Sequence, residues 1–208
     1  IRLDGWWNRM QAMEFAPVMA VTAVAAVAGM PLMANGANLA FRRKNFFQVE
    51  GYSGNHHLAS GDDQFLLSKF KARWPDSIRF AFDQSAIVTT AGQPSIGQLM
   101  GQRVRWAGKW GKTKSLPLMI TAVFVFMVQL ATLALPPLVL VGGSEALLLL
   151  LPVRWMAEYF LMVAAGRYFR FPVPIHEFLL LALVYPFYVM AVALRTLGPR
   201  VFWKGRKV

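Results

Sequence analysis

The chain has 208 residues, of which 56% are hydrophobic, with a mean hydropathy of +0.42 and a formal net charge of +12. A soluble domain rarely combines such hydropathy with so basic a balance, whereas membrane proteins with cytoplasmic lysine and arginine do so routinely. Anionic membrane lipid is therefore the expected partner rather than nucleic acid, and the absence of cysteine excludes disulfides and thiolate metal sites.

The N-terminal segment has the spacing of a helix. Apolar and aromatic residues from Ile1 to Phe15 are separated by polar positions, which predicts an amphipathic helix. The uncharged run from Phe15 to Ala34 is long enough to cross a membrane. Because Pro17, Gly29 and Pro31 interrupt this run, we expect a buried helix and a short strand instead. Nothing here resembles a signal peptide, and the first residue is not methionine, so we expect a fragment of a longer protein.

Two polar motifs follow this segment. Asn35-Gly36-Ala37-Asn38 has the composition of a turn, and a short basic helix to about Glu50 comes after it. Asp62 and Asp63 stand at the start of a predicted helix that runs to Lys71, where the helix dipole favours acidic side chains. Capping alone explains only one of these two carboxylates.

The stretches beside that helix predict a loop and a strand pair. Residues 51–60 form the predicted loop, and His56 and His57 within it point apart on any regular element and lack a third ligand at useful spacing. No metal site is therefore predicted there. The stretch from Trp74 to Thr90 predicts a strand and its return. Its alternating apolar residues are Ile78, Phe80 and Phe82.

The helix predicted over Ile96 to Trp110 carries the most distinctive motif. Gln102, Arg105 and Trp106 are spaced so that they project from one face of this helix. An amide, a cation and a flat ring suit a sugar phosphate, because a guanidinium grips phosphate oxygens and an indole stacks on a pyranose. The helix continues to about residue 114 without an acidic residue, which is also typical of a basic helix at a membrane surface.

Beyond Ser115 the chain predicts three membrane spans, at about 116–141, 144–165 and 176–195, and a basic tail. Arg154 and Glu158 lie within the second span, where charges are costly unless they neutralise one another or face a polar channel. The basic run before the first span places the preceding residues in the cytoplasm. Three spans then leave the basic tail outside, which contradicts the positive-inside tendency unless the second segment does not cross fully or the tail is an exception.

Three motifs precede the spans in a fixed order: Asn35-Gly36-Ala37-Asn38-Leu39-Ala40-Phe41-Arg42-Arg43, Gly61-Asp62-Asp63 and Gln102-x-x-Arg105-Trp106. In this order they resemble the second half of a membrane-bound family 2 glycosyltransferase, the group that includes cellulose, chitin and hyaluronan synthases. The resemblance implies an α/β fold. Residues 1–100 would be the acceptor-side part of an inverting GT-A domain without its nucleotide-binding half, 101–114 an interface helix, and 115–208 an α-helical transmembrane bundle with a basic tail.

The resemblance also implies roles for single residues. Asp63 would be the base that takes the proton from the acceptor hydroxyl, and Asp62 would orient the acceptor or the neighbouring helix. The substrate-binding residues would be Asn35, Gly36, Ala37, Asn38, Gln102, Arg103, Arg105 and Trp106. The implied substrates are a nucleotide-sugar donor and a glycan or lipid acceptor. The implied ion is Mg²⁺ or Mn²⁺, with ligands outside this chain, because the sequence contains no Asp-x-Asp.

Two other classes of function stay open at this point. The chain could be a catalytically incomplete or degenerate membrane fragment in which the motifs have only a structural role. A transporter or channel segment is the third class, motivated by the charges at Arg154 and Glu158, but three spans without a repeat argue against it.

Overall fold

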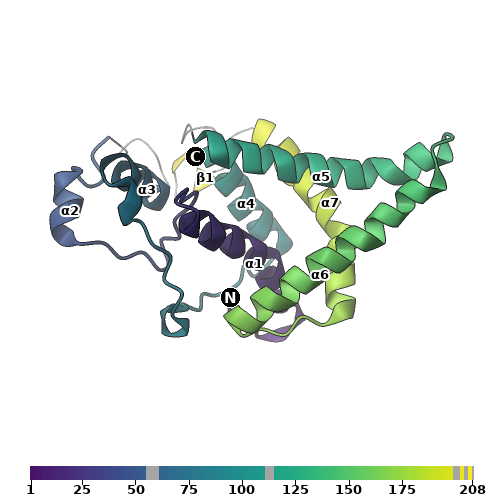
Figure 1. Cartoon of the computed structure of the whole chain (residues 1–208), viewed down its shortest axis with the longest axis horizontal. Coiled ribbons are helices and arrows are strands. Elements are labelled where there is room, and N and C mark those ends of the chain that lie inside the picture. Colours follow the sequence, from purple (N-terminus) through teal and green to yellow (C-terminus); the bar gives the residue numbers. More distant parts are fainter. Residues whose placement is uncertain (55–60, 111–114, 199–201, 204–205, 208) are drawn as a thin grey trace.

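The computed structural model describes residues 1–54, 61–110, 115–198, 202–203 and 206–207. In these residues the chain forms seven α-helices (Figure 1). They are α1 (Gly5–Val27), α2 (Arg43–Gln48), α3 (Asp62–Arg73), α4 (Ile96–Trp110), α5 (Leu116–Leu140), α6 (Leu150–Phe169) and α7 (Ile175–Leu197). Three short 3-10 helices lie between them, at Pro75–Ser77, Gln84–Ala86 and Glu145–Leu149.

The predicted α/β fold is wrong, because the described part of the chain is all-α. Its only strands are the two-residue β1 (Phe202–Trp203) and β2 (Arg206–Lys207), which pair antiparallel. The stretch from Trp74 to Thr90, predicted as a strand pair, is irregular apart from two 3-10 turns, and no strand follows α1 before residue 35. Alternation alone does not make a strand, since the backbone also needs a neighbour for its hydrogen-bond ladder.

Helix α1 joins the two segments that were predicted separately at the N-terminus. It continues through Pro17, and more than half of its most apolar window, 56%, is buried inside the protein. Met13 is fully buried and Ala16 nearly so. These side chains pack in a core with Met162 of α6 and Phe178 of α7. The predicted helix is present, but of the run from Phe15 only Ala16 belongs to this core, and Val24 and Val27 are 69% and 72% exposed. Because α1 is also long and apolar enough to cross a membrane, the prediction that this run is buried instead of spanning is not confirmed.

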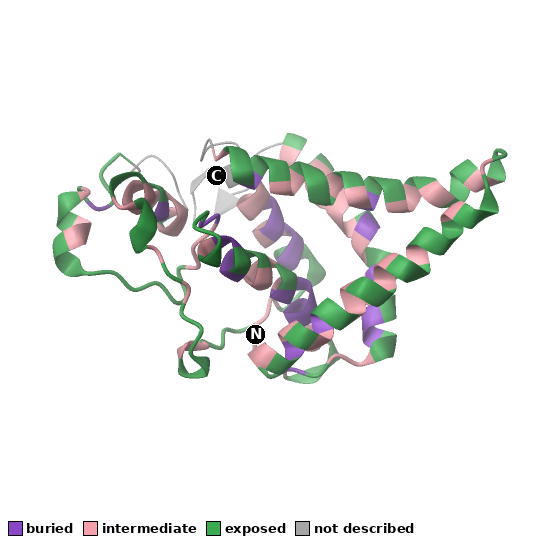
Figure 2. Ribbon diagram, in the orientation of Figure 1, coloured by how far each residue is buried: buried purple, intermediate pink, exposed green. Residues whose placement is uncertain are grey.

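Four helices are long and apolar enough to cross a membrane, as expected of a multi-pass membrane protein. They are α1, α5, the segment Glu145–Phe169 that contains α6, and α7. Burial separates α1 from the other three, whose apolar windows are only 11%, 6% and 22% buried. Figure 2 shows exposed residues along most of α5 and α6. Large apolar side chains that face outward along a helix are suited to lipid.

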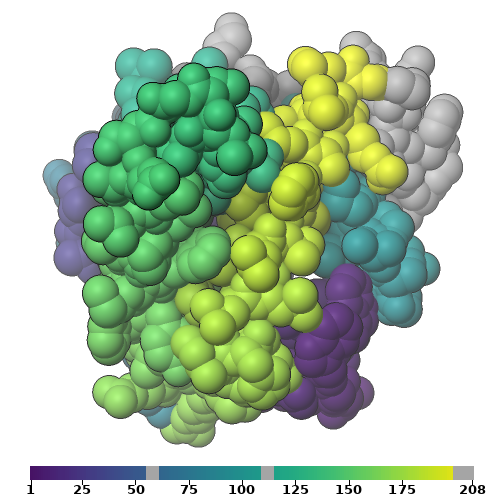
Figure 3. Space-filling view, turned by 90° about the vertical axis from the view of Figure 1, so that its right-hand side faces the viewer, coloured from purple at the N-terminus to yellow at the C-terminus, as the bar shows by residue number. Residues whose placement is uncertain are grey.

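The long helices enclose α7 between two groups. Helices α5 and α6 meet at residues 141–149 and diverge from there, and α7 connects their other ends (Figure 1). Helix α7 packs against α4, α5 and α1. In the view of Figure 3, α7 lies between the α5–α6 pair and α1. The predicted interface helix α4 is therefore joined to the membrane helices through α7, whereas α1 contacts both α6 and α7.

Candidate functional site

The hydrogen bonds place the predicted site residues in two groups, and the first joins the Asn35–Asn38 turn to α3. The backbone amide of Gly36 donates to Asp63 Oδ2 at 3.0 Å. The other carboxylate oxygen, Oδ1, accepts from the amide of Gln64 at 2.8 Å. Amides in the first turn of a helix have no acceptor within the helix, so a side chain there satisfies one of them. Two motifs that are 27 residues apart thus meet at one carboxylate.

Gln64 fastens the same junction from the next position of α3. Its Oε1 accepts from the amide of Ala34 at 3.3 Å, and its Nε2 donates to the carbonyl of Leu32 at 2.8 Å. Both ends of this amide are therefore bonded to the segment that leads into the Asn35–Asn38 turn. The sequence did not predict this role for Gln64. The one feature that could have indicated it is the position of Gln64 directly after the two aspartates.

The predicted turn is confirmed, and hydrogen bonds within the turn hold two of its backbone amides. The amide of Asn38 donates to the carbonyl of Asn35 at 3.0 Å, and Asn35 Oδ1 accepts from the amide of Ala37 at 3.0 Å. The side-chain amide of Asn38 donates to the carbonyl of Ala86. Gly36, Ala37 and Asn38 are exposed and Asp63 is partly exposed. A hydroxyl-bearing ligand can therefore reach the carboxylate of Asp63 and the backbone around it.

The second group lies on α4, where the predicted helix over Ile96–Trp110 is confirmed. Arg103 is 9% exposed and donates from Nε to both oxygens of Glu14, at 3.0 and 3.2 Å. Its Nη1 donates to Gln102 Oε1. The guanidinium carbon lies 4.3 Å from the ring centre of Trp106, which also contacts Phe15 with ring centres 5.6 Å apart. Arg103 thus holds α4 against α1 and supports the Trp106 ring.

Charge and burial differ between the two arginines of this motif. Burial lowers the pKa of Arg103, but the hydrogen bond and charge of Glu14 outweigh it and raise that pKa above its ordinary value. Arg105 is partly buried, and desolvation lowers the pKa of its guanidinium. The guanidinium of Arg103 is thus directed at Glu14, and the contact of Arg105 with a diphosphate stays a prediction.

Glu14 was not singled out from the sequence, although it connects three helices. Besides Arg103 of α4, it accepts from the hydroxyl of Tyr188 on α7 at 3.3 Å. A second pair, Arg9 with Glu177, ties the start of α1 to the start of α7, and its side chains are 30% and 1% exposed. The signal was present in the sequence, because both carboxylates stand beside long apolar runs where an unpaired charge is costly.

The predicted neutralisation of Arg154 by Glu158 is confirmed. Arg154 Nε donates to Glu158 Oε1 at 2.8 Å, and its Nη2 donates to Gln129 Oε1 of α5 at 3.1 Å. Thr132 of α5 accepts from the same guanidinium. The charge is thus satisfied within the α5–α6 pair, as a polar group in an apolar helix requires.

The described residues contain no group of three or more His, Cys, Asp or Glu side chains that could hold a metal ion. His56 and His57 lie outside those residues, as does the end of the basic run at 111–114. No family model, no curated protein and no solved structure matches the chain. The candidate site therefore stands on its residues and their geometry.

Proposed function

We propose that this chain is the acceptor-side part of a membrane-bound glycosyltransferase. It would transfer a sugar with inversion from a nucleotide-sugar donor to a glycan or lipid acceptor at the cytoplasmic face. One observation carries the proposal: the Asp63 carboxylate is held at an exposed junction between α3 and the Asn35–Asn38 turn by the amide of Gly36 at 3.0 Å. A carboxylate fixed beside exposed backbone amides suits the activation of a sugar hydroxyl.

The chemistry needs a base at this point. As the acceptor oxygen attacks the anomeric carbon, the bond from that carbon to the diphosphate oxygen breaks, and the hydroxyl proton passes to Asp63. Each carboxylate oxygen has two acceptor positions, so the bonds from Gly36 and Gln64 leave Asp63 able to take a proton. Asp62 would orient the acceptor. Arg105 would contact the donor diphosphate, and Gln102 and Trp106 the acceptor sugar.

The metal of the proposal is Mg²⁺ or Mn²⁺, which would offset the charge of the departing nucleoside diphosphate. The described residues do not offer three clustered ligands, so they do not form a site for this ion. Its ligands are expected in the donor-binding part outside this sequence, and no step is assigned to it in this chain.

A structural role is the second candidate, and the same contacts favour it. Both carboxylate oxygens of Asp63 accept hydrogen bonds from backbone amides, one from Gly36 and one from Gln64 at the start of α3. A carboxylate used in this way holds a loop to a helix whether or not any reaction takes place. A degenerate membrane fragment would keep these contacts for stability alone.

Sugar transfer by the full-length protein in membranes separates the two candidates. UDP- and GDP-sugars are supplied with Mg²⁺ or Mn²⁺, and the native protein is compared with Asp63→Asn and with Asp76→Asn, an exposed aspartate of the 3-10 turn at Pro75–Ser77. Asn can keep the Gly36 bond but cannot take the proton. We expect Asp63→Asn to lose about 10²-fold or more in turnover with donor binding retained, and Asp76→Asn to stay native-like.

The opposite results are equally informative. Unchanged turnover in Asp63→Asn would rule out Asp63 as the base. No turnover with any donor in the native protein would favour the structural role.

A further inference from the structure

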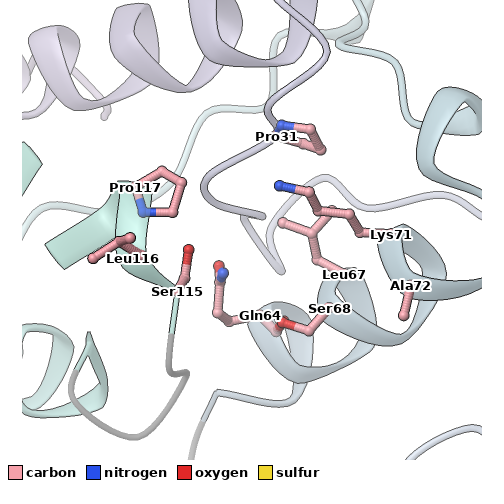
Figure 4. A pocket seen from close by; sticks show the side chains of 9 residues that line it. All are labelled: Pro31, Gln64, Leu67, Ser68, Lys71, Ala72, Ser115, Leu116 and Pro117. Atoms are coloured by element: carbon pink, nitrogen blue, oxygen red, sulfur yellow. The ribbon is translucent and has the colours of Figure 1, made fainter. Parts of the chain in front are cut away.

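A pocket of about 340 Å³ lies where α3 meets the start of α5 (Figure 4). It is lined by three segments that are far apart in the sequence. Helix α3 contributes one wall, the first residues of α5 the opposite wall, and Pro31 the third side. The lining residues are Pro31, Gln64, Leu67, Ser68, Lys71, Ala72, Ser115, Leu116 and Pro117.

The polar side of the pocket has unused hydrogen-bond donors. Gln64 is bonded to the backbone on both ends, and Ser68 donates to the carbonyl of Gln64 at 3.0 Å. Lys71 is the one charged residue of the lining and, within the described part of the chain, forms no ion pair. Ser115 makes no capping hydrogen bond to α5. An ammonium and a hydroxyl are thus left for a ligand, with no carboxylate in the lining to repel an anion.

The apolar side of the pocket continues onto an exposed apolar surface of α5. Leu67, Leu116 and the two prolines form this side, and Figure 4 shows Lys71 reaching toward Pro31 above Leu67. Past the pocket, α5 presents Met119 and Ile120, which are 45% and 59% exposed. Because α5 is long and apolar enough to span a membrane, we expect its start to lie at the boundary between headgroups and hydrocarbon.

We propose that this pocket binds the phosphate of an anionic membrane lipid. The phosphate oxygens accept from Lys71 Nζ and Ser115 Oγ, and the first part of the lipid's apolar chains lies against Leu116 and continues along α5. A charge-assisted bond next to apolar surface recognises an amphiphile better than it recognises a free anion. The net charge of +12 favours the same class of ligand. The proposal concerns a site separate from the Asp63 carboxylate and does not depend on sugar transfer.

Lipid binding to the purified full-length protein in detergent tests the proposal. Native mass spectrometry compares phosphatidylglycerol with phosphatidylcholine at equal concentrations, for the native protein, Lys71→Gln and Arg73→Gln. Arg73 is a matched control because it shares the last turn of α3 with Lys71, is exposed, and does not line the pocket. We expect the native protein to prefer phosphatidylglycerol, Lys71→Gln to bind it about fivefold more weakly, and Arg73→Gln to bind as the native protein does.

A second variant tests the cavity without changing charge. Ala72 lines the pocket and is exposed. The larger side chain of Ala72→Phe should therefore fill the pocket without disturbing the buried residues of α3. We expect it also to lose the preference for phosphatidylglycerol, with circular dichroism unchanged.

Three results would overturn the proposal. Equal losses in Lys71→Gln and Arg73→Gln would indicate general surface charge. Native binding by Ala72→Phe would exclude the cavity. Displacement of phosphatidylglycerol by millimolar inorganic phosphate would assign the site to a free anion instead of a lipid.

Discussion

The ion pair of Glu14 and Arg103 is the residue-scale feature on which the packing of α1, α4 and α7 depends. The two side chains are 9% and 10% exposed, so water does not solvate either charge well. A buried pair of this kind gives little net stability compared with apolar residues, but removing one partner leaves an uncompensated charge in the interior. The pair therefore favours the packing in which these faces of the helices meet, because any other packing would leave one charge buried and unpaired.

Glu14→Gln tests this constraint. The substitution keeps the shape of the side chain but removes the charge that offsets the Arg103 guanidinium. We expect it to lower the free energy of unfolding by about 3–5 kcal/mol, measured by denaturant unfolding in detergent.

The control for this substitution is Asp4→Asn. It breaks the ion pair between Asp4 and Arg2. Because both of these side chains are 71% exposed, we expect the free energy of unfolding to fall by about 0–1 kcal/mol. A similar small loss in Glu14→Gln would show that Arg103 is solvated or has another partner in the folded protein.

At the scale of elements, the approach of the residues after α6 to that helix depends on Gly166. A methyl group at this position would lie 2.7 Å from Val173 Cγ2 and 2.8 Å from the carbonyl oxygen of Phe171. The second of these is backbone, and the amide of Phe171 bonds to the carbonyl of Gly166 at 2.9 Å, so it has little freedom to move. We expect Gly166→Ala to destabilise the protein by about 1–3 kcal/mol in thermal unfolding.

Gly101→Ala is the matched control, since this glycine also lies within a helix. A methyl group there would meet nothing within 4 Å, so the better helix propensity of alanine should stabilise α4 by about 1 kcal/mol. A stability gain in both variants would contradict the close contact at Gly166.

Helices were predictable in this chain because their signals are local. The helix over Ile96–Trp110 needs only its own spacing and Ser95, whose Oγ accepts from the amide of Gln98 at 3.3 Å. The spans need only long apolar runs, although the second of them contains Arg154 and Glu158. The strand pair over Trp74–Thr90 was predicted from alternation in the same way, but a strand depends on a partner elsewhere, and alternation carries no information about that partner.

The candidate site was predictable only in part for a similar reason. Its residue types were chosen by resemblance, and the contact of Asp63 with Gly36 agrees with grouping those two motifs. The pairing of Arg103 with Glu14 spans 89 residues and could not be read from spacing. Arg103 was predicted to bind substrate together with its neighbours, whereas its guanidinium is directed at Glu14. Whether the remaining motif residues bind substrate stays a prediction.

At the scale of the whole molecule, the two outer ends of the α5–α6 pair both contact segments that precede α4. The start of α5 forms the lipid pocket with α3, and the end of α6 reaches the segment before α4 through Tyr168, whose hydroxyl donates to the carbonyl of Phe82 at 2.7 Å. Arg170 donates to Gln84 Oε1 at 2.8 Å in the same segment. Because both outer ends lie away from residues 141–149 (Figure 1), we expect the pair to cross the membrane twice, with residues 141–149 on the far side.

Helix α7 follows a different course. Its start is tied to the start of α1 by Glu177, and it packs against α4 as well as α5. Helix α4 has 15 residues, about 22 Å, and is too short to cross a hydrocarbon core of about 30 Å. Because α7 runs beside α4 and connects the outer ends of α5 and α6, we expect its end to stay on the side of α4 (Figure 1). The basic tail then agrees with the positive-inside tendency.

Single cysteines test this topology cleanly, because the chain has none of its own. Ser77, Ser144 and Leu197 are exposed and stand before α4, between α5 and α6, and at the end of α7. Each is changed to cysteine in turn, and intact cells are treated with a membrane-impermeant maleimide. We expect only Ser144→Cys to be labelled before permeabilisation and all three afterwards. Labelling of Leu197→Cys in intact cells would show that α7 crosses the membrane and that the tail departs from the positive-inside tendency.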